Sequence, residues 1–412
     1  MKIKSEVYPI LLLNFVNALG FSVILPVLPF IIKQFNETPL TYGFLVSAYA
    51  IFQFLGAPIL GSLSDKYGRR PLLLVSQAGT LLSWVIFGLS YFLPDKTIVV
   101  TSLPILVIAI SRIVDGITGG NISVANAYLA DITEPKERTK IYGISGAIFG
   151  LAFIIGPVVG SFAASGGIGY LGTALLAFCI SLVTLLLIIF RVPESLTEFD
   201  KELEIKLIKE INIFKKIRTL KSKKLSNLFL RRIFFTVGFS SYTTLITLYV
   251  QNRYKLEVTQ VGFVFLIIGL FLFINQGFFA KRFAEKFGEL KTYFIGQILY
   301  ILGLIILLFA TNIYLFFIIS YFINLGVSLS IPTFKTIITS AVDNKKQGLI
   351  NGIDESLFSI SSAFAPILAG LIYTFVGYKI TVIIALVVSI QYIVTLLQVK
   401  SVDRLKKEVL GD

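Results

Sequence analysis

Apolar runs of about 20 residues recur along the whole chain, and each is long enough to cross a hydrocarbon core of about 30 Å as a helix. The runs are continuous, whereas a membrane β-barrel would show shorter segments of alternating polarity. We count twelve runs, at 8–32, 40–61, 72–92, 102–125, 139–163, 169–190, 226–250, 259–280, 291–310, 313–336, 347–373 and 377–398. The pattern predicts an all-α membrane protein with twelve transmembrane helices.

Residues 191–225 interrupt this pattern with many lysines. Apolar residues recur there at spacings of three and four, as on one face of an amphipathic helix: Phe199, Leu203, Leu207, Ile211, Phe214 and Ile217. Because a basic amphipathic helix binds an anionic membrane surface, we expect a cytoplasmic linker between two bundles, 1–190 and 226–400, followed by a cytoplasmic tail at 401–412. A binding site for a soluble partner is a second interpretation of this segment.

The two halves of the sequence resemble each other. Residues 136–143 align with 345–352, and the same offset pairs Gly156-Pro157 with Ala365-Pro366. Separately, residues 64–68 align with 284–288. Because both pairs lie six runs apart, the sequence predicts two pseudo-symmetric six-helix bundles.

The chain of 412 residues is 56% hydrophobic and only 15% charged, which excludes a soluble domain of this length. Its net charge of +14 arises from alternate loops. The loops on the other side hold only Lys33, Lys96, Arg253, Lys255 and Lys379. This asymmetry follows the positive-inside rule. It predicts a multi-pass protein of the plasma (inner) membrane with both termini in the cytoplasm, and it explains the basic charge without a nucleic-acid partner.

Histidine is absent and cysteine occurs once, at Cys179. One thiol forms neither an intrachain disulfide nor a metal site, and no imidazole is available to carry a proton. No nucleotide-binding loop of the Gly-x4-Gly-Lys type is evident. We therefore expect no enzyme activity, no metal and no cofactor.

The short loop at 61–71 carries three cations and one carboxylate between two apolar runs. Its order, Gly-x-x-x-Asp-(Lys/Arg)-x-Gly-Arg-(Lys/Arg), resembles the signature loop between helices 2 and 3 of the major facilitator superfamily. In that family the loop latches the cytoplasmic side. The resemblance implies a gate made of Gly61, Asp65, Gly68, Arg69 and Arg70, with Asp131 and Arg138 as partners. The plainer interpretation is a set of solvated loop charges.

The second copy of this loop is degraded, because Glu285 stands where Asp65 does but Glu289 replaces Arg69. We therefore expect an asymmetric latch that is strong on the N-terminal side.

Arg112 and Asp115 lie within the fourth run, three residues apart on one helix face. An arginine near the middle of a span is costly, by about 2.5 kcal/mol or more, unless it faces water or a partner. The sequence Arg-Ile-Val-Asp-Gly resembles the second motif of the superfamily, which implies that Arg112 influences a proton-carrying carboxylate. A purely structural ion pair is the alternative.

Small residues follow one stripe of the fifth run: Gly143, Ala152, Gly156, Pro157, Gly160 and Ser161. Such a stripe lets helices approach closely, and the proline favours a kink. The pattern resembles the packing motif of the antiporter branch, apart from alanine and serine at two glycine positions. It implies an exporter.

The first run contains Asn14, Asn17 and the pattern Leu-Pro-Val-Leu-Pro, which resembles the twelve-span drug:proton antiporters of the tetracycline and multidrug efflux kind. That group usually has carboxylates where Asn17 and Ser83 stand here. Neither residue can carry a proton, so the usual coupling site and tetracycline specificity are not expected.

Asp354 and Glu355 in the eleventh run offer replacement carboxylates. If the helix begins near Gln347, Glu355 lies about 12 Å deep. No cation is evident nearby in the sequence, so we expect one of these carboxylates to carry the proton, whereas Asp115 beside Arg112 should stay ionised. A later helix start, with both carboxylates at the cytoplasmic mouth, is the alternative.

Polar residues within the runs are candidates for binding the solute. They are Asn14, Asn17, Gln53, Asn121, Asn275, Gln276 and Asn324. Each is as well explained as a contact between helices.

Together these features predict a major facilitator fold and a secondary transporter that exports small amphipathic or lipophilic compounds in exchange for protons. We expect a monomer whose partners are the solute, protons and the lipid bilayer. Uptake of a nutrient such as a sugar or organic acid is an alternative function, and a non-transporting membrane sensor is a more distant one.

Cysteines introduced at Ser195 and Lys379 are expected to react with a membrane-impermeant maleimide from opposite sides of the membrane, because the charge asymmetry places these loops on opposite sides. The measurement is labelling of intact and of permeabilised cells, with Cys179→Ala as the background. Labelling of both positions from one side would show that the helix count is wrong.

Overall fold

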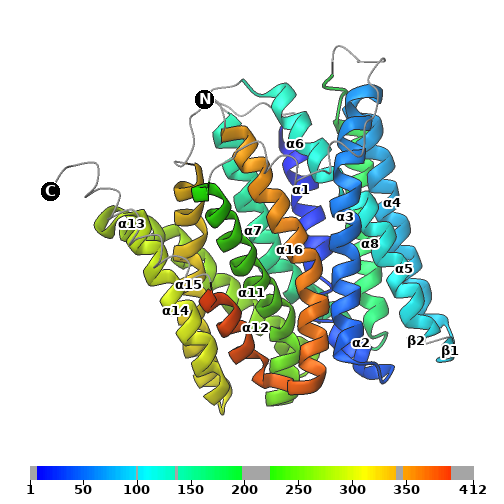
Figure 1. Ribbon diagram of the computed structural model, residues 1–412. Helices are drawn as coiled ribbons and strands as arrows, with labels where there is room; N and C mark the ends of the chain where they lie inside the picture. The colour runs from blue at the N-terminus through cyan, green and yellow to red at the C-terminus, as the bar shows by residue number, and fades with distance from the viewer. Residues whose placement is uncertain (1–6, 99–100, 135–137, 197–222, 340–346, 391–412) are drawn as a thin grey trace. The chain divides into compact units, whose positions relative to one another are not determined.

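The computed structural model describes residues 7–98, 101–134, 138–196, 223–339 and 347–390 (Figure 1). These residues are helical apart from turns and one short antiparallel pair, β1 (Thr97–Ile98) with β2 (Thr101–Ser102). Nine helices within them are long and apolar enough to cross a membrane, and Val7–Ser22 and Gly150–Ala164 are shorter apolar helices. The fold is helical as predicted, and the helix count is consistent with twelve spans. Most of the predicted linker and the whole predicted tail lie outside the described residues.

The chain forms two compact units, residues 1–212 with 250–269, and residues 213–249 with 270–412. The division passes through two helices, so residues 250–269 belong with the first unit. The bundle boundaries predicted from the sequence, 1–190 and 226–400, stay a prediction.

The helices of the first unit follow the first six apolar runs. They are α1 (Val7–Ser22), α2 (Leu28–Gln34), α3 (Pro39–Tyr67), α4 (Arg69–Leu89), the 3-10 turn η1 (Ser90–Phe92), α5 (Leu103–Gly119), α6 (Asn121–Ile132), α7 (Arg138–Ala164) and α8 (Tyr170–Arg191). Helix α1 packs on α7, α3 on α5, and α4 on α5 and α8. Prolines near the starts of α3 and α5 suit the first turn of a helix, where no backbone N–H is needed.

The first run is not one continuous helix, as its length suggested. Helix α1 ends at Ser22, and α2 begins only at Leu28. Tighter hydrogen bonds to the third preceding residue hold the turns between them, from Leu25 N–H to Ser22 O (3.3 Å) and from Val27 N–H to Ile24 O (3.0 Å). Pro26 lies between them without a backbone donor, which explains why the regular helix stops there.

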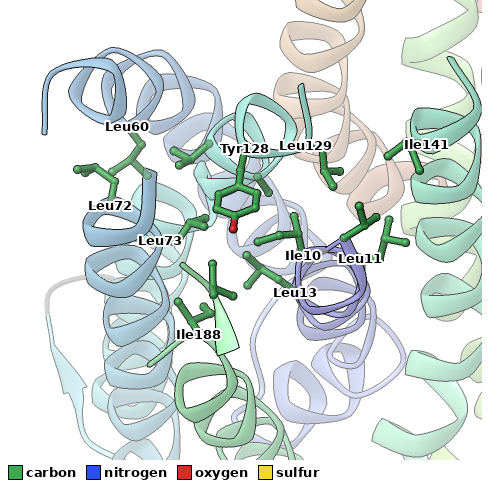
Figure 2. Packing of buried hydrophobic residues seen from close by; sticks show 14 residues of the cluster. Ile10, Leu11, Leu13, Leu60, Leu72, Leu73, Tyr128, Leu129, Ile141 and Ile188 are labelled. Carbon is green, nitrogen blue, oxygen red and sulfur yellow. The ribbon is translucent and has the colours of Figure 1, made fainter. Parts of the chain in front are cut away.

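A cluster of buried apolar side chains lies within the first unit (Figure 2). It joins α1, α3, α4, α6, α7 and α8. Tyr128 of α6 lies at its centre with its ring fully buried, and its hydroxyl donates to Pro193 O at 3.0 Å. That bond satisfies the polar end of a large apolar side chain, so Tyr128 ties the end of α8 to α6.

The described helices of the second unit and of the crossing segments follow the remaining runs. They are α11 (Lys223–Tyr254), α12 (Val258–Ile274), the π-helical turn η2 (Asn275–Ala280), α13 (Lys281–Phe287), α14 (Glu289–Ile306), η3 (Leu307–Phe309), α15 (Ile313–Thr339), α16 (Gln347–Val376) and η5 (Gly377–Lys379). Residues 380–390 are also helical. Helix α14 packs along α15. A buried apolar cluster joins α11, α14, α15 and α16, and it includes Phe229, Tyr293, Phe334 and Ile353.

Substitutions at glycines of α7 can test how closely this helix packs on the segment at the end of α1. A methyl group added at Gly160 would lie 2.0 Å from Val23 O, a backbone atom, whereas one added at Gly150 of the same helix meets nothing within 4 Å. Gly160→Ala is therefore expected to destabilise the protein by about 1–3 kcal/mol, the usual cost of overpacking.

The matched control Gly150→Ala should leave the melting temperature in detergent unchanged or raise it slightly, because alanine is the better helix former. Equal melting temperatures for the two variants would contradict the close α1–α7 contact.

Candidate functional site

The predicted gate lies where α3 ends and α4 begins, at Gly68. Its φ of 99° favours glycine. The turn brings Arg69 back toward α3, where its guanidinium lies 2.5 Å from the Asp65 carboxylate and donates to Ser64 Oγ at 2.6 Å. The Nε of Arg69 also donates to Asp131 of α6 at 3.0 Å. Arg69 is only 7% exposed, so one buried arginine links three helices through two carboxylates.

Glu194 completes this network, and the sequence reasoning missed it. Its carboxylate accepts hydrogen bonds from the backbone N–H groups of Arg69 (2.9 Å) and Arg70 (3.0 Å), at the first turn of α4. A carboxylate there satisfies donors that have no partner within the helix and complements the helix dipole. The available signal was a lone carboxylate in the sequence Val-Pro-Glu-Ser, directly after the sixth apolar run.

The other gate candidates have separate contacts. Arg70 donates to Ile189 O of α8 at 2.8 Å, and Asp131 also accepts from Ser195 Oγ at 3.0 Å. A methyl group at Gly61 would lie 3.5 Å from Ser123 Oγ, an ordinary contact distance. Arg138 is the first residue of α7, and its side chain lies outside the described residues. The structure thus brings Asp65, Arg69 and Asp131 together, and the gating roles stay predictions.

The second copy of the loop shows no comparable cluster among the described side chains. Glu285 contacts Lys281 at 3.7 Å, and both side chains are largely exposed. Glu289 begins α14 after the turn at Gly288. An exposed pair of this kind contributes little to stability.

Arg112 and Asp115 form the second buried ion pair, 3.2 Å apart on α5. Arg112 is 1% exposed, and its guanidinium stacks on Trp84 (4.7 Å to the ring centre) and Phe87 (5.5 Å) of α4. A buried charge needs both a counter-ion and polarisable neighbours. The pair therefore suits either a structural role or a coupling role, and it lies beside the break in the first run.

The surroundings of Asp354 differ from the sequence-based expectation. Its carboxylate is fully buried and contacts two cations, Arg232 of α11 at 2.9 Å and Lys335 of α15 at 3.1 Å. Within the described residues, α16 runs from Gln347 to Val376. The expectation of no cation nearby was wrong, because both partners come from other helices.

Arg232 is held more firmly than Lys335. Its guanidinium lies over the rings of Phe334 (5.9 Å) and Phe358 (5.0 Å), and its side chain is 10% exposed, against 41% for Lys335. The neighbouring carboxylate, Glu355, is part of α16, but its side chain lies outside the described residues.

Four of the polar candidates for solute binding make hydrogen bonds within the protein, those of Asn14 and Asn17 to another helix, and that of Gln53 to Tyr49 and that of Asn324 within their own helix. Asn17 donates to Asn121 (2.8 Å), Asn14 to Ser145 (2.9 Å), Gln53 to Tyr49 (3.0 Å) and Asn324 to Ser320 O (2.7 Å). Asn275 is fully buried in the π-helical turn η2, whereas Gln276 beside it is exposed. Asn14, Asn17, Gln53 and Asn121 belong to the first unit and Asn275, Gln276 and Asn324 to the second, and their role in solute binding stays a prediction.

The small residues of α7 face the end of α1. Ser22 donates to Ala152 O at 3.0 Å, and a methyl group at Gly156 would lie 2.0 Å from Ser22 Oγ. Together with Gly160 and Pro157 they form a surface on which the broken first run lies. Gly143 belongs to α7, and its surroundings lie outside what the structure describes.

The sequence is similar to that of known membrane transport proteins. A family model described as Major Facilitator Superfamily matches residues 10–282 and 276–410. The chain is 28% identical over 378 residues to the tetracycline resistance protein, class C, of Escherichia coli, covering 90% of this chain and 91% of that protein. It is 27% identical over 375 residues to multidrug resistance protein 2 of Bacillus subtilis (strain 168), covering 90% and 89%.

Solved structures show the same fold. A bacterial homologue of the human lysosomal transporter Spinster, in an inward-facing and occupied conformation, matches with a TM-score of 0.76 at 12% identity, covering 96% of each chain. The human organic anion transporter MFSD10 matches with a TM-score of 0.67 at 20% identity, covering 95% of this chain and 98% of that one. These similarities confirm the predicted fold class.

Asp65→Asn is expected to slow transport about tenfold while leaving folding and membrane insertion nearly intact. The change weakens a charge-assisted hydrogen bond to buried Arg69 by about 1.5 kcal/mol, at the low end of the usual range because Asp65 is half exposed. The matched control is Lys66→Gln, since Lys66 contacts the ring of its neighbour Tyr67 rather than the Arg69 network. Equal transport rates for the two variants in vesicles would remove the gate hypothesis.

Proposed function

The chain belongs to the Major Facilitator Superfamily, and we propose that it exports small amphipathic or lipophilic compounds across the membrane in exchange for protons. As a member of this family it is a multi-pass membrane transporter rather than an enzyme. The observation that carries the proposal is the similarity, over about nine tenths of the chain, to proteins named for tetracycline and multidrug resistance.

Transport would follow alternating access, in which a cytoplasmic latch opens and closes once in each cycle. The ion network of Asp65, Arg69 and Asp131 supports this role, because it ties the ends of three helices to one buried cation. Glu194 would act with it by anchoring the first turn of α4. The network would stabilise the closed latch that each cycle must pass through, so weakening it is expected to slow the cycle.

The proton would be carried by Asp115, Asp354 or Glu355. Protonating Asp354 would leave the buried Arg232 without the charge of this counter-ion, and an unpaired buried charge is strongly unfavourable. Protonating Asp115 would leave Arg112 in the same state. These costs favour Glu355 as the carrier, with Arg112 tuning Asp115 as the second candidate.

The proposed solute is not tetracycline in particular. Asn17 pairs with Asn121, and Ser83 hydrogen-bonds Thr80 O and the side chain of Asp115, so uncharged residues occupy the positions where the tetracycline exporters usually have carboxylates. We propose that the protein works as a monomer in the plasma membrane with both termini in the cytoplasm. It would need no bound cofactor, because the proton gradient supplies the energy.

Purified protein in liposomes with an imposed pH gradient should concentrate some members of a dye and drug panel while the internal pH changes. Glu355→Gln is expected to abolish this uphill transport and to retain downhill exchange, because exchange requires no titratable group. Asp115→Asn and Asp354→Asn are the comparison variants, each checked for its melting temperature.

If Glu355→Gln still concentrates the solute and Asp115→Asn does not, coupling belongs to Asp115. The export proposal itself fails if no compound on the panel moves in response to either direction of the gradient.

A further inference from the structure

A small cavity lies inside the first unit, at the break between α1 and α2. Its walls include Ile24 and Leu25 from the non-helical turns, Val46 and Tyr49 from α3, and Arg112 from α5. The free space is about 10 Å³, which is close to the minimum for one water-sized group. Apart from Arg112 and the hydroxyl of Tyr49, these walls are apolar.

Arg112 reaches this cavity with unused donors. Its Nη2 donates to Ser111 Oγ at 3.3 Å, and its Nη1 lies 3.2 Å from Asp115 without the geometry of a hydrogen bond. Its Nε has no hydrogen-bond partner among the described residues. The same holds for the indole Nε1 of Trp84, the ring on which the guanidinium stacks. Both side chains are 1% exposed.

Unsatisfied donors in an apolar interior are costly, by about 1–3 kcal/mol each. Guanidinium N–H groups can donate but cannot accept, so the missing partner of Arg112 is an acceptor; Trp84 is not among the residues that line the cavity. A guanidinium binds an anionic oxygen more strongly than a neutral one, because the hydrogen bond is charge-assisted. The space available fits a single oxygen, and the apolar walls around it suit a hydrocarbon body.

We propose that this cavity is a subsite for the anionic oxygen of a lipophilic organic acid, held by Arg112 and bordered by Ile24, Leu25 and Val46. The inference rests on the proposed export function and narrows its solutes to amphipathic anions. The turns between α1 and α2 would admit the body of the acid, because Pro26 has no backbone donor and the bonds of Leu25 and Val27 reach only the third preceding residue.

The protein carries its own reporter for this site. Trp84 is the only tryptophan in the chain, and it stacks directly on Arg112. Its fluorescence therefore reports an anion at the guanidinium without any added label.

The test compares three ligands of matched shape, which are cyclohexanecarboxylate, cyclohexanecarboxamide and cyclohexylmethylammonium, titrated into purified protein in detergent at constant ionic strength. We expect a saturable change in Trp84 fluorescence, with the carboxylate binding at least about tenfold more tightly than the amide and the ammonium ion not binding. Equal affinities for carboxylate and amide, or a change with no saturation, would overturn the proposal, the latter indicating a site that holds water only.

Two variants locate the binding. Arg112→Gln should remove the preference for the carboxylate, and Val46→Phe should abolish binding by filling the cavity. Ile246→Phe, which fills a cavity in the second unit, is the matched control and should bind as the unmodified protein does. Retained carboxylate preference in a folded Val46→Phe protein would contradict the site even if Arg112→Gln fails to fold.

This measurement needs no gradient, so it separates the two proposals. Anion binding without uphill transport would contradict the export function alone. Uphill transport of neutral or cationic compounds, with no selective anion binding, would contradict this inference alone.

Discussion

Buried arginines must find carboxylates in an interior that offers almost no water, and this constraint organises both units. Arg69 meets Asp65 and Asp131, Arg112 meets Asp115, and Arg232 meets Asp354. An arginine left unpaired at such a depth would cost several kcal/mol. The pairs of Arg69 and Arg232 join different helices and so fix how those helices lie against one another within their unit. The Arg112–Asp115 pair, by contrast, lies within α5.

The internal repeat makes the distribution of these charges informative. In the register that aligns residues 136–143 with 345–352, Asp354 corresponds to Ser145. Ser145 accepts a hydrogen bond from Asn14 of α1, whereas Asp354 pairs with Arg232 of α11. A neutral contact in one unit thus stands where the other has an ion pair. The two halves share a fold, but equivalent positions in them carry different charges. Such a difference suits a transporter whose halves have different roles.

The helices were predictable from the sequence because a continuous run of about 20 apolar residues indicates a transmembrane helix without any knowledge of distant contacts. The Arg112–Asp115 pair was predictable for a similar reason, since a spacing of three places both on one helix face. Contacts between distant segments carried no such signal. The cations beside Asp354 and the carboxylate of Glu194 at the start of α4 depend on how helices pack, and the sequence alone does not state that packing.

The break in the first run was missed for a related reason, although Pro26 was visible. A proline in an apolar run is compatible with a kinked helix as well as with a broken one. Close packing favours the break here. Ser22 and Val23 lie so close to Gly156 and Gly160 of α7 that a methyl group on either glycine would overlap them. The same contact holds the turns beside Arg112. The small residues of α7 and Arg112 of α5 are therefore two parts of one arrangement. Close packing on α7 keeps the turns between α1 and α2 out of a regular helix, and these turns border the cavity at Arg112.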